Sequence, residues 1–430
     1  MKEYQKCAKE MLEFVDKSPS CFHAVANVID ILKGQGFEEL KETQEWKAEP
    51  GKGYYVTRND SSLIAFRLPR NPEEIRGFHI VASHSDSPAF KIKELPEKTT
   101  ENYYIVLNTE KYGGMILSTW LDRALSVAGR IVVRGKEGTE TKLVNIDKDL
   151  LVIPNVAIHM NRDMNSGVAY NPQIDMLPLF ADCGGGKKKA SLMKKVAKTA
   201  GVKQEDILGH DLFLYTREKG RILGDDGEFI LSPRLDDLQC VFSSVKAFAN
   251  TCPQKYINVC AVFDNEEVGS GTKQGADSTF LEDALWRVAE SLNKSRSGYL
   301  CLVAGSFLVS ADNAHAVHPN HPELADPTNR PVLNGGVVIK YHGSQKYTTD
   351  AVSAAKLKTL CEQVKVPFQT YANRSDILGG STLGNISTAH VSVSSVDIGL
   401  PQLAMHSAVE TAGVKDTKYA VDMFTAFYGE

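Results

Sequence analysis

Apolar and polar residues follow two kinds of pattern in the first part of the chain. Apolar side chains recur at helical spacing through residues 4–33, which predicts helices there. Two shorter apolar runs, 53–57 and 62–68, flank a polar turn and predict a β-hairpin. The next run, 77–83, is mostly apolar and leads directly into His84. A run without regular alternation of apolar and polar residues is typical of a strand buried on both faces, so we expect His84 at the end of such a strand.

The middle of the chain has a different pattern of apolar and polar residues. From about residue 91 to residue 223, short alternating runs predominate and long helical patterns are scarce, which predicts a separate, mainly β unit. We therefore predict one domain from residues 1–91 and 228–430, with residues 92–227 forming a β-rich domain inserted into it.

Helical and strand patterns alternate in the last part of the chain. The predicted elements are a helix at 236–248, a strand at 257–263, a helix at 280–293, an apolar run at 307–311, a strand at 336–340, a helix at 350–364, a strand at 393–400 and a helix at 419–427. Such alternation predicts an α/β fold with a mixed, largely parallel sheet and helices on both faces.

Composition narrows the class of protein. The chain has 430 residues, 42% of them hydrophobic and 24% charged, with a net charge of -4. These values are typical of a globular protein of two domains and give no reason to expect nucleic-acid or membrane partners. The first residues contain acidic side chains and no apolar signal core, no run approaches a membrane span, and the eight cysteines lack metal-binding spacing. We expect a cytoplasmic protein with reduced thiols.

Two adjacent glutamates, Glu266 and Glu267, follow the predicted strand 257–263. In open α/β sheets the carboxyl ends of strands carry the chemistry, so both side chains occupy a favourable position. One carboxylate could hold a metal ion while its neighbour accepts a proton from a water molecule. Taken alone, the pair also fits a solvated turn after a strand.

Five further polar residues lie where apolar runs end: His84, Asp86, Asp236, Asp312 and His406. Imidazole and carboxylate ligands suit zinc or a similar divalent ion, and their number suffices for two ions. Each residue also has a structural interpretation. A His-x-Asp pair often forms a surface hydrogen bond, and an aspartate often caps a helix or lies in its first turn, as Asp312 and Asp237 could. The residue types alone leave a metal hydrolase and these structural roles open.

The stretch Cys183–Lys189 combines glycines with lysines. No Gly-Lys-Ser/Thr follows at the offset that a phosphate-binding loop requires, so we interpret Gly184–Lys189 as a mobile, solvated loop.

Several motifs follow one another along the chain: His84-Ser85-Asp86-Ser87-Pro88, Tyr112-Gly113-Gly114, Ser118-Thr119-Trp120-Leu121-Asp122-Arg123, Ile158-His159-Met160-Asn161-Arg162, Ser232-Pro233-Arg234-Leu235-Asp236, Asp264 to Ser270, Ser310-Ala311-Asp312 running to His318-Pro319-Asn320, and Gly380-Ser381-Thr382-Leu383-Gly384. These motifs resemble those of the M18 aminopeptidases, the aspartyl aminopeptidase family of dinuclear metallopeptidases. The similarity covers nearly the whole chain in the family's order.

The resemblance implies a role for each site residue. His84 and Asp312 would hold one metal ion, Glu267 and His406 the other, and Asp236 would bridge them. The ions would be zinc, although cobalt and manganese accept the same ligands. Asp86 would orient His84, since a ligand imidazole needs an acceptor for its other N–H. Glu266 would act as general base.

Substrate binding and assembly are also implied by the resemblance. His159 would reach the active site of a neighbouring subunit and help bind substrate there. Lys340 would face the side chain of an acidic first residue, although a lysine that ends a strand at the surface is the alternative. Family members form a tetrahedral homododecamer built from dimers, in which the inserted domain would act as a dimerisation or lid domain.

The predicted function is that of a metallo-aminopeptidase, a dinuclear zinc exopeptidase that removes N-terminal Asp or Glu from peptides. Three alternatives remain. The enzyme could prefer neutral residues, or a related metal hydrolase could cleave acylated amino acids or C-terminal residues. The chain could also be a non-catalytic assembly protein, which should lack bound metal. A glycosidase is disfavoured, because its two carboxyl groups must face each other across a sugar ring.

Overall fold

The computed structural model describes residues 2–187 and 189–430 and divides the chain into two compact units. Unit 1 comprises the chain up to Asp86 together with Gly220–Met405 and Glu410–Glu430. Unit 2 comprises Ser87–Lys219 and the short segment His406–Val409. The predicted boundaries, after residues 91 and 227, lie later in the chain than these, and the assignment of His406–Val409 to unit 2 was not predicted.

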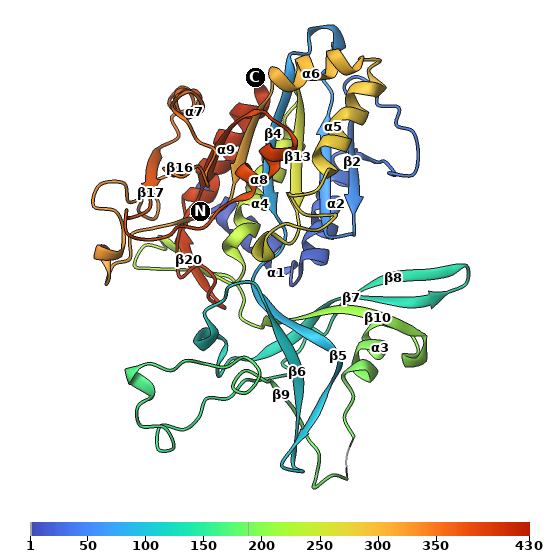
Figure 1. Ribbon diagram of the computed structural model, residues 1–430, viewed down its shortest axis with the longest axis vertical. Coiled ribbons are helices and arrows are strands. Elements are labelled where there is room, and N and C mark those ends of the chain that lie inside the picture. The colour runs from blue at the N-terminus through green and yellow to red at the C-terminus, as the bar shows by residue number, and fades with distance from the viewer. Residues whose placement is uncertain (1, 188) are drawn as a thin grey trace. The chain divides into compact units, whose positions relative to one another are not determined.

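A nine-stranded sheet forms the centre of unit 1 (Figure 1). In spatial order its strands are β1 (Glu38–Glu39), β2 (Gly53–Arg58), β3 (Ser62–Arg67), β13 (Tyr256–Phe263), β4 (Gly77–His84), β14 (Phe307–Ala311), β18 (Ser394–Gly399), β16 (Val337–Tyr341) and β17 (Phe368–Ala372). Strands β13, β4, β14 and β18 are mutually parallel, whereas β3 and β16 run antiparallel to their neighbours β13 and β18. The predicted mixed, largely parallel sheet is confirmed.

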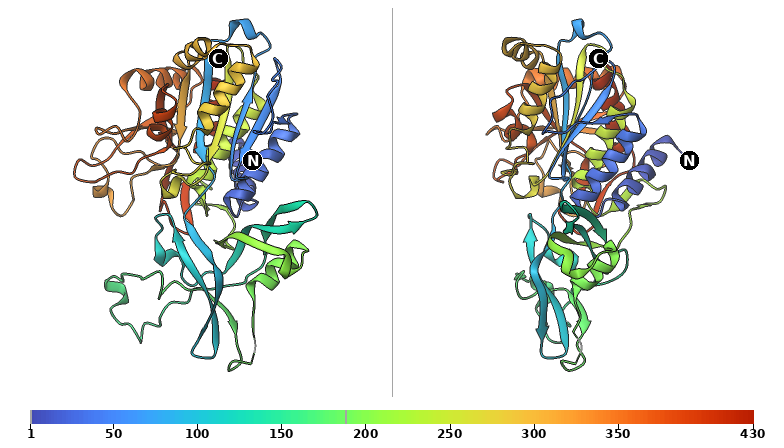
Figure 2. Two further views of the ribbon diagram at one scale, coloured as in Figure 1. Left: turned by 45° about the vertical axis from the view of Figure 1, so that its right-hand side comes forward. Right: turned by 90° about the vertical axis from the view of Figure 1, so that its right-hand side faces the viewer.

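Helices cover both faces of this sheet (Figures 1 and 2). One face packs against α1 (Glu3–Asp16), α2 (Cys21–Gly34), α4 (Leu235–Asn250), α7 (Ala351–Gln363) and α9 (Asp416–Gly429). The other packs against α5 (Phe280–Ser291), α6 (Arg296–Ala304) and α8 (Leu383–His390). Alternate residues of one strand serve the two cores: in β13, Val262 packs on the first face and Phe263 on the second. This double burial explains why the central strands are apolar at most positions and do not alternate with polar residues.

A second, five-stranded sheet completes unit 1. Its order is β11 (Arg221–Leu223), β12 (Phe229–Ser232), β20 (Glu410–Gly413), β19 (Pro401–Leu403) and β15 (Ala314–His315). Strand β15 begins just after β14 in the chain, and β19 just after β18. The carboxyl ends of two central strands are therefore continued by a separate sheet.

Unit 2 is built on a six-stranded antiparallel sheet. Its order is β8 (Gly138–Asn145), β7 (Leu125–Gly135), β10 (Ile207–Thr216), β5 (Ala89–Thr100), β6 (Tyr104–Tyr112) and β9 (Leu179–Asp182). Helix α3 (Leu192–Ala200) contributes Leu192 and Val196 to the core of this unit. Lys188, part of the predicted solvated loop, lies outside the described residues, while Gly184–Lys187 on its amino-terminal side is exposed.

Candidate metal centre and substrate pocket

The site residues of unit 1 lie at the carboxyl ends of adjacent central strands. His84 is the last residue of β4, Asp312 follows β14, and the 3₁₀-helix Glu266–Val268 follows β13. Because β13, β4 and β14 are parallel neighbours, their carboxyl ends share one edge of the sheet. The positions of these strands explain why residues so far apart in sequence meet.

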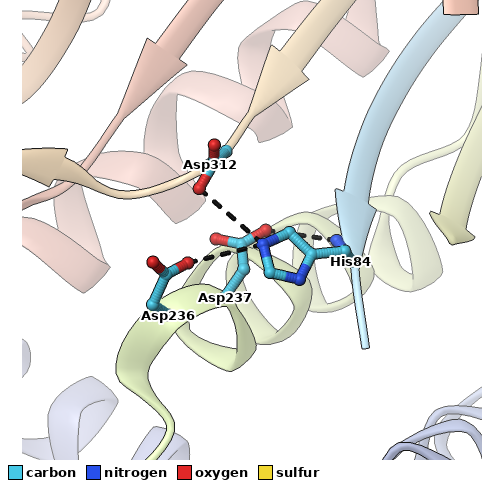
Figure 3. A group of neighbouring side chains, drawn as sticks. All are labelled: His84, Asp236, Asp237 and Asp312. Atoms are coloured by element: carbon cyan, nitrogen blue, oxygen red, sulfur yellow. Dashed lines mark hydrogen bonds and ion pairs between the residues drawn. The ribbon is translucent and has the colours of Figure 1, made fainter. Parts of the chain in front are cut away.

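His84 is buried among carboxylates (Figure 3). Its Nδ1 lies 3.1 Å from the backbone oxygen of Asp86, which can only accept, so Nδ1 carries the hydrogen. Nε2 then faces Asp236 Oδ1 at 3.4 Å and Asp312 Oδ1 at 3.7 Å. Burial alone would lower the pKa of His84, but the hydrogen-bonding carboxylates outweigh burial and raise that pKa well above its ordinary value.

Asp236 and Asp237 reach this cluster from the start of α4. Neither has helical backbone angles, so the regular helix begins after Asp237 rather than at Asp236 as predicted. The peptide bond between them is cis. The Asp236 backbone N–H donates to Glu410 Oε2 at 3.1 Å, and the His84 N–H donates to Asp237 Oδ2 at 3.2 Å. Asp237 is therefore part of the cluster. The sequence predicts Asp237 only as a residue of a first helical turn and does not place it in the site.

Asp86 organises the two glutamates as well as His84. Its Oδ1 lies 3.4 Å from His84 Nδ1. The same carboxylate accepts the backbone N–H groups of Glu266 and Glu267, each at 3.2 Å. Sequence reasoning assigned Asp86 only the orientation of His84, because hydrogen bonds to a segment 180 residues away leave no local signal.

The donor atoms are compatible with a bound cation. Ligand atoms of His84, Asp236, Asp237 and Asp312 lie within 4.8 Å of one another, and so do those of His84, Glu266 and Glu267. Asp237 Oδ1 is buried without a hydrogen-bond partner among the described residues. Several buried carboxylates so close together repel one another unless a positive charge lies between them, and an imidazole with carboxylates suits zinc.

Lys340 is buried beside the cluster, not exposed at a strand end. The side chain comes from β16, and the residue is 2% exposed. Its Nζ lies 3.5 Å from Asp312 Oδ2 and donates to the Asn313 backbone oxygen at 3.2 Å. Burial alone would lower the pKa of Lys340, but several nearby acidic groups, Asp312 foremost, together outweigh burial and hold that pKa above its ordinary value. The surface alternative for Lys340 is thus wrong.

Two predicted residues, His159 and His406, belong to unit 2. His159 is exposed in the irregular segment before the 3₁₀-helix Met164–Ser166. The His406 Nδ1 lies 2.6 Å from the backbone oxygen of Gly114, so Nδ1 carries the hydrogen and Nε2 is the acceptor nitrogen of the neutral ring. Their roles stay predictions.

Comparisons with known proteins identify the family. A family model described as "Aminopeptidase I zinc metalloprotease (M18)" matches residues 14–428. The chain belongs to the M18 family of metallo-aminopeptidases. It is 48% identical over 431 residues to "Probable M18 family aminopeptidase 2" of Clostridium novyi (strain NT), covering 100% of both chains. A protein of the same name from Pseudomonas syringae pv. tomato is 38% identical, with 98% of this chain and 97% of that protein covered.

Solved structures agree with this assignment. The M18 chain resembles one in "Cryo-EM structure of the Ape4 and Nbr1 complex" with a TM-score of 0.96 and 37% identity, covering 99% of this chain and 86% of that one. It also resembles the S. cerevisiae mApe1 dodecamer with a TM-score of 0.87 and 27% identity, covering 99% and 97%. Among the described residues of this M18 enzyme, no helix has both the length and the apolar character that crossing a membrane requires.

Proposed function

We propose that this M18 enzyme removes N-terminal aspartate or glutamate from peptides by hydrolysis that depends on two divalent metal ions, most simply zinc. The observation that carries the proposal is the position of Lys340. Its buried ammonium lies beside Asp312, at the sheet edge where the histidine and carboxylates cluster. A buried cation next to the reacting centre would favour a substrate with a carboxylate on its first side chain.

The proposed ligands divide between two ions. His84 and Asp312 would hold the first ion, Glu267 and His406 the second, and Asp236 would contact both. In support, His84 presents Nε2 to Asp236 and Asp312, and the hydrogen bond of His406 Nδ1 fixes the tautomer in which Nε2 is the acceptor nitrogen, as a metal ligand requires. Bound ions would supply Lewis acidity, lowering the pKa of a water molecule and polarising the scissile carbonyl group.

Glu266 would be the general base. Burial raises the pKa of Glu266 to about 8, and nearby carboxylates such as Asp312 add to the effect. An ionised carboxylate whose proton affinity is close to that of a metal-activated water molecule can accept a proton from it and return it to the leaving amine. Asp86 would position this base, because it binds the backbone N–H groups of both glutamates. Asp86 would also keep Nδ1 of His84 protonated.

We further propose a homo-oligomer, built from dimers into a dodecamer, with unit 2 as its dimerisation domain and His159 reaching the site of a neighbouring copy. One structural relative is a dodecamer, according to its title. His159 lies between Ile158 and Met160, which are 46% and 82% exposed. Exposed apolar residues beside a predicted substrate-binding residue are expected where another copy packs. The eight free thiols fit the proposed cytoplasmic location.

A peptide panel tests the proposal. Peptides that differ only in their first residue (Asp, Glu, Leu or Lys) would be assayed before chelation, after chelation and after zinc, cobalt or manganese is added back. We expect release of Asp and Glu that chelation abolishes and metal restores. Restored activity led by Leu would contradict the acidic preference. Cleavage that survives N-acetylation of the peptide would contradict an aminopeptidase and favour an acyl-amino-acid hydrolase.

A further inference from the structure

Asp397, on β18, is a fully buried carboxylate outside the metal cluster. Its Oδ2 accepts the backbone N–H of Thr348 at 2.6 Å and the Thr348 hydroxyl at 2.8 Å, while Oδ1 accepts the hydroxyl of Thr382. A buried carboxylate is costly unless several donors satisfy it. These bonds tie the segment before α7 and the start of α8 to the middle of the sheet.

The backbone around Asp397 is shaped for this carboxylate. A Cβ atom added at Gly384, in the first turn of α8, would lie 2.6 Å from Asp397 Oδ1. Only glycine lets the helix approach the carboxylate this closely. A further hydrogen bond joins β18 to the segment before α7, because the Asp397 N–H donates to the Thr349 hydroxyl at 2.9 Å. The segment 348–349 is therefore fixed to β18 by both the side chain and the backbone of Asp397.

The anchored segment lies next to the proposed specificity residue. Tyr347, which precedes Thr348, is 5% exposed, and the Lys340 Nζ lies 5.3 Å from the centre of its ring. Ile339 pairs with Ile398 in the antiparallel ladder of β16 and β18, so Lys340 and Asp397 are the next residues along the two strands. Side chains at such cross-strand positions project from the same face of the sheet.

We propose that Asp397 is a positioning residue for specificity: it fixes Tyr347 and, through that ring, the Lys340 ammonium, and thereby sets the preference for an acidic over a neutral first residue. The inference rests on the proposed function. In the absence of the Asp397 anchor, Tyr347 would move and the ammonium could take other positions. A peptide carboxylate would then lose its partner, whereas a neutral first residue would be bound as before.

The test compares two isosteric substrates, peptides that begin with Asp or with Asn and are otherwise identical. In Asp397→Asn, one acceptor oxygen remains in place of two, so the amide cannot accept from Thr348 and from the Thr382 hydroxyl at the same time. We expect the Asp/Asn ratio of kcat/KM to fall about tenfold, the size typical of coupling between contacting residues, mainly through a higher KM for the Asp peptide. The Thr348 amide should also exchange its hydrogen faster.

Further variants distinguish a specific effect on the Asp/Asn ratio from a general loss of stability. Asp350→Ala removes the cap of α7 three residues after Tyr347, since Asp350 Oδ1 accepts the Ser353 N–H at 2.7 Å. It should lower stability and leave the ratio unchanged. Thr382→Val, a second probe if Asp397→Asn fails to fold, should lower the ratio, whereas Thr382→Ser keeps the hydroxyl donor and should preserve it.

The outcomes separate this inference from the proposed function. If wild type prefers the Asp peptide and Lys340→Ala removes that preference, the proposed function stands. An unchanged ratio in Asp397→Asn, or an equal loss on both peptides, would then overturn the role of Asp397 alone. A wild-type enzyme without acidic preference would overturn the proposed preference and this inference together.

Discussion

Two histidines of strand β4, His79 and His84, have nearly the same burial and opposite surroundings. They are 0% and 1% exposed. The His79 ring stacks on Tyr256 and Phe427, with ring centres 3.6 and 4.3 Å away, whereas His84 faces carboxylates. Burial lowers the pKa of His79 to about 3, while the carboxylates raise that of His84. Neighbouring charges, and not burial itself, decide which histidine is suited to bind metal.

Two lysines show the same contrast. Lys340 lies beside Asp312, which raises its pKa. Lys356 lies 4.3 Å from the centre of the Phe307 ring, near the His79 end of the sheet, and burial lowers its pKa. At the amino end of the central strands, His79 and Lys356 therefore pack against aromatic rings, whereas at the carboxyl end His84 and Lys340 lie beside carboxylates. This difference predicts that substitutions at the amino end mainly change stability, whereas substitutions at the carboxyl end mainly change activity.

The largest difference between the two ends of the sheet is expected when His84 or His79 is replaced by glutamine. His84→Gln should reduce hydrolysis by about a hundredfold or more through lost metal affinity, because a ligand is removed. His79→Gln should retain most activity and lower the free energy of unfolding by about 2 kcal/mol, because ring packing is lost. Metal content and kcat/KM measure the loss of activity, and urea unfolding measures the loss of stability, in each of the two variants. Equal losses of activity in the two variants would contradict the claim that only the carboxyl end of the central strands carries the catalytic site.

A smaller effect on activity is expected from the lysines. Lys340→Ala should lower kcat/KM for Asp peptides about tenfold to a hundredfold more than for Asn peptides, because a desolvated charge partner is lost. Lys356→Ala, the matched control, should leave the ratio unchanged. If Lys340→Ala reduces both peptides by the same factor, Lys340 has no part in specificity.

The third expectation concerns stability as a function of pH. The His79 pKa is about 3 in the folded chain and about 6.5 when exposed, so the unfolded chain binds the proton first as pH falls. Stability from neutral His79 is therefore complete above about pH 6.5 and is lost as pH falls towards 3. Glu430 Oε2, 3.7 Å from Nε2, opposes this shift, but it is too distant for a hydrogen bond and partly solvated, so burial dominates.

Comparison with His79→Phe isolates this effect. Between pH 6.5 and 4.5 wild type should lose about 2 kcal/mol more than the variant, since each pH unit well below 6.5 contributes about 1.4 kcal/mol per proton and the unfolded histidine is only half protonated at pH 6.5. His23, whose pKa burial lowers to about 4, contributes equally to both proteins and cancels in the comparison. Parallel stability curves for the two proteins would show that folding does not lower the pKa of His79.

The sequence predicts the strands and helices with strong periodicity but not the contacts between distant segments. The runs leading to His84 and to Glu266 mark buried strands, and both are strands in the structure. Helix α8 and strand β17 were not predicted, because α8 is short and β17 is only half-buried. The hydrogen bonds from Thr348 to Asp397 join residues 49 positions apart, and no spacing rule connects them. The ligand set came from motifs similar to those of a known family, not from spacing.

The central claim is that the carboxyl end of the sheet binds metal for a reaction in which Glu266 transfers the proton. The most direct test measures bound metal and turnover together in Glu266→Gln. The account predicts wild-type metal content, an unchanged fold and a loss in kcat of about a hundredfold to ten-thousandfold, the contribution typical of a general base. Near-normal turnover at full metal content would contradict it.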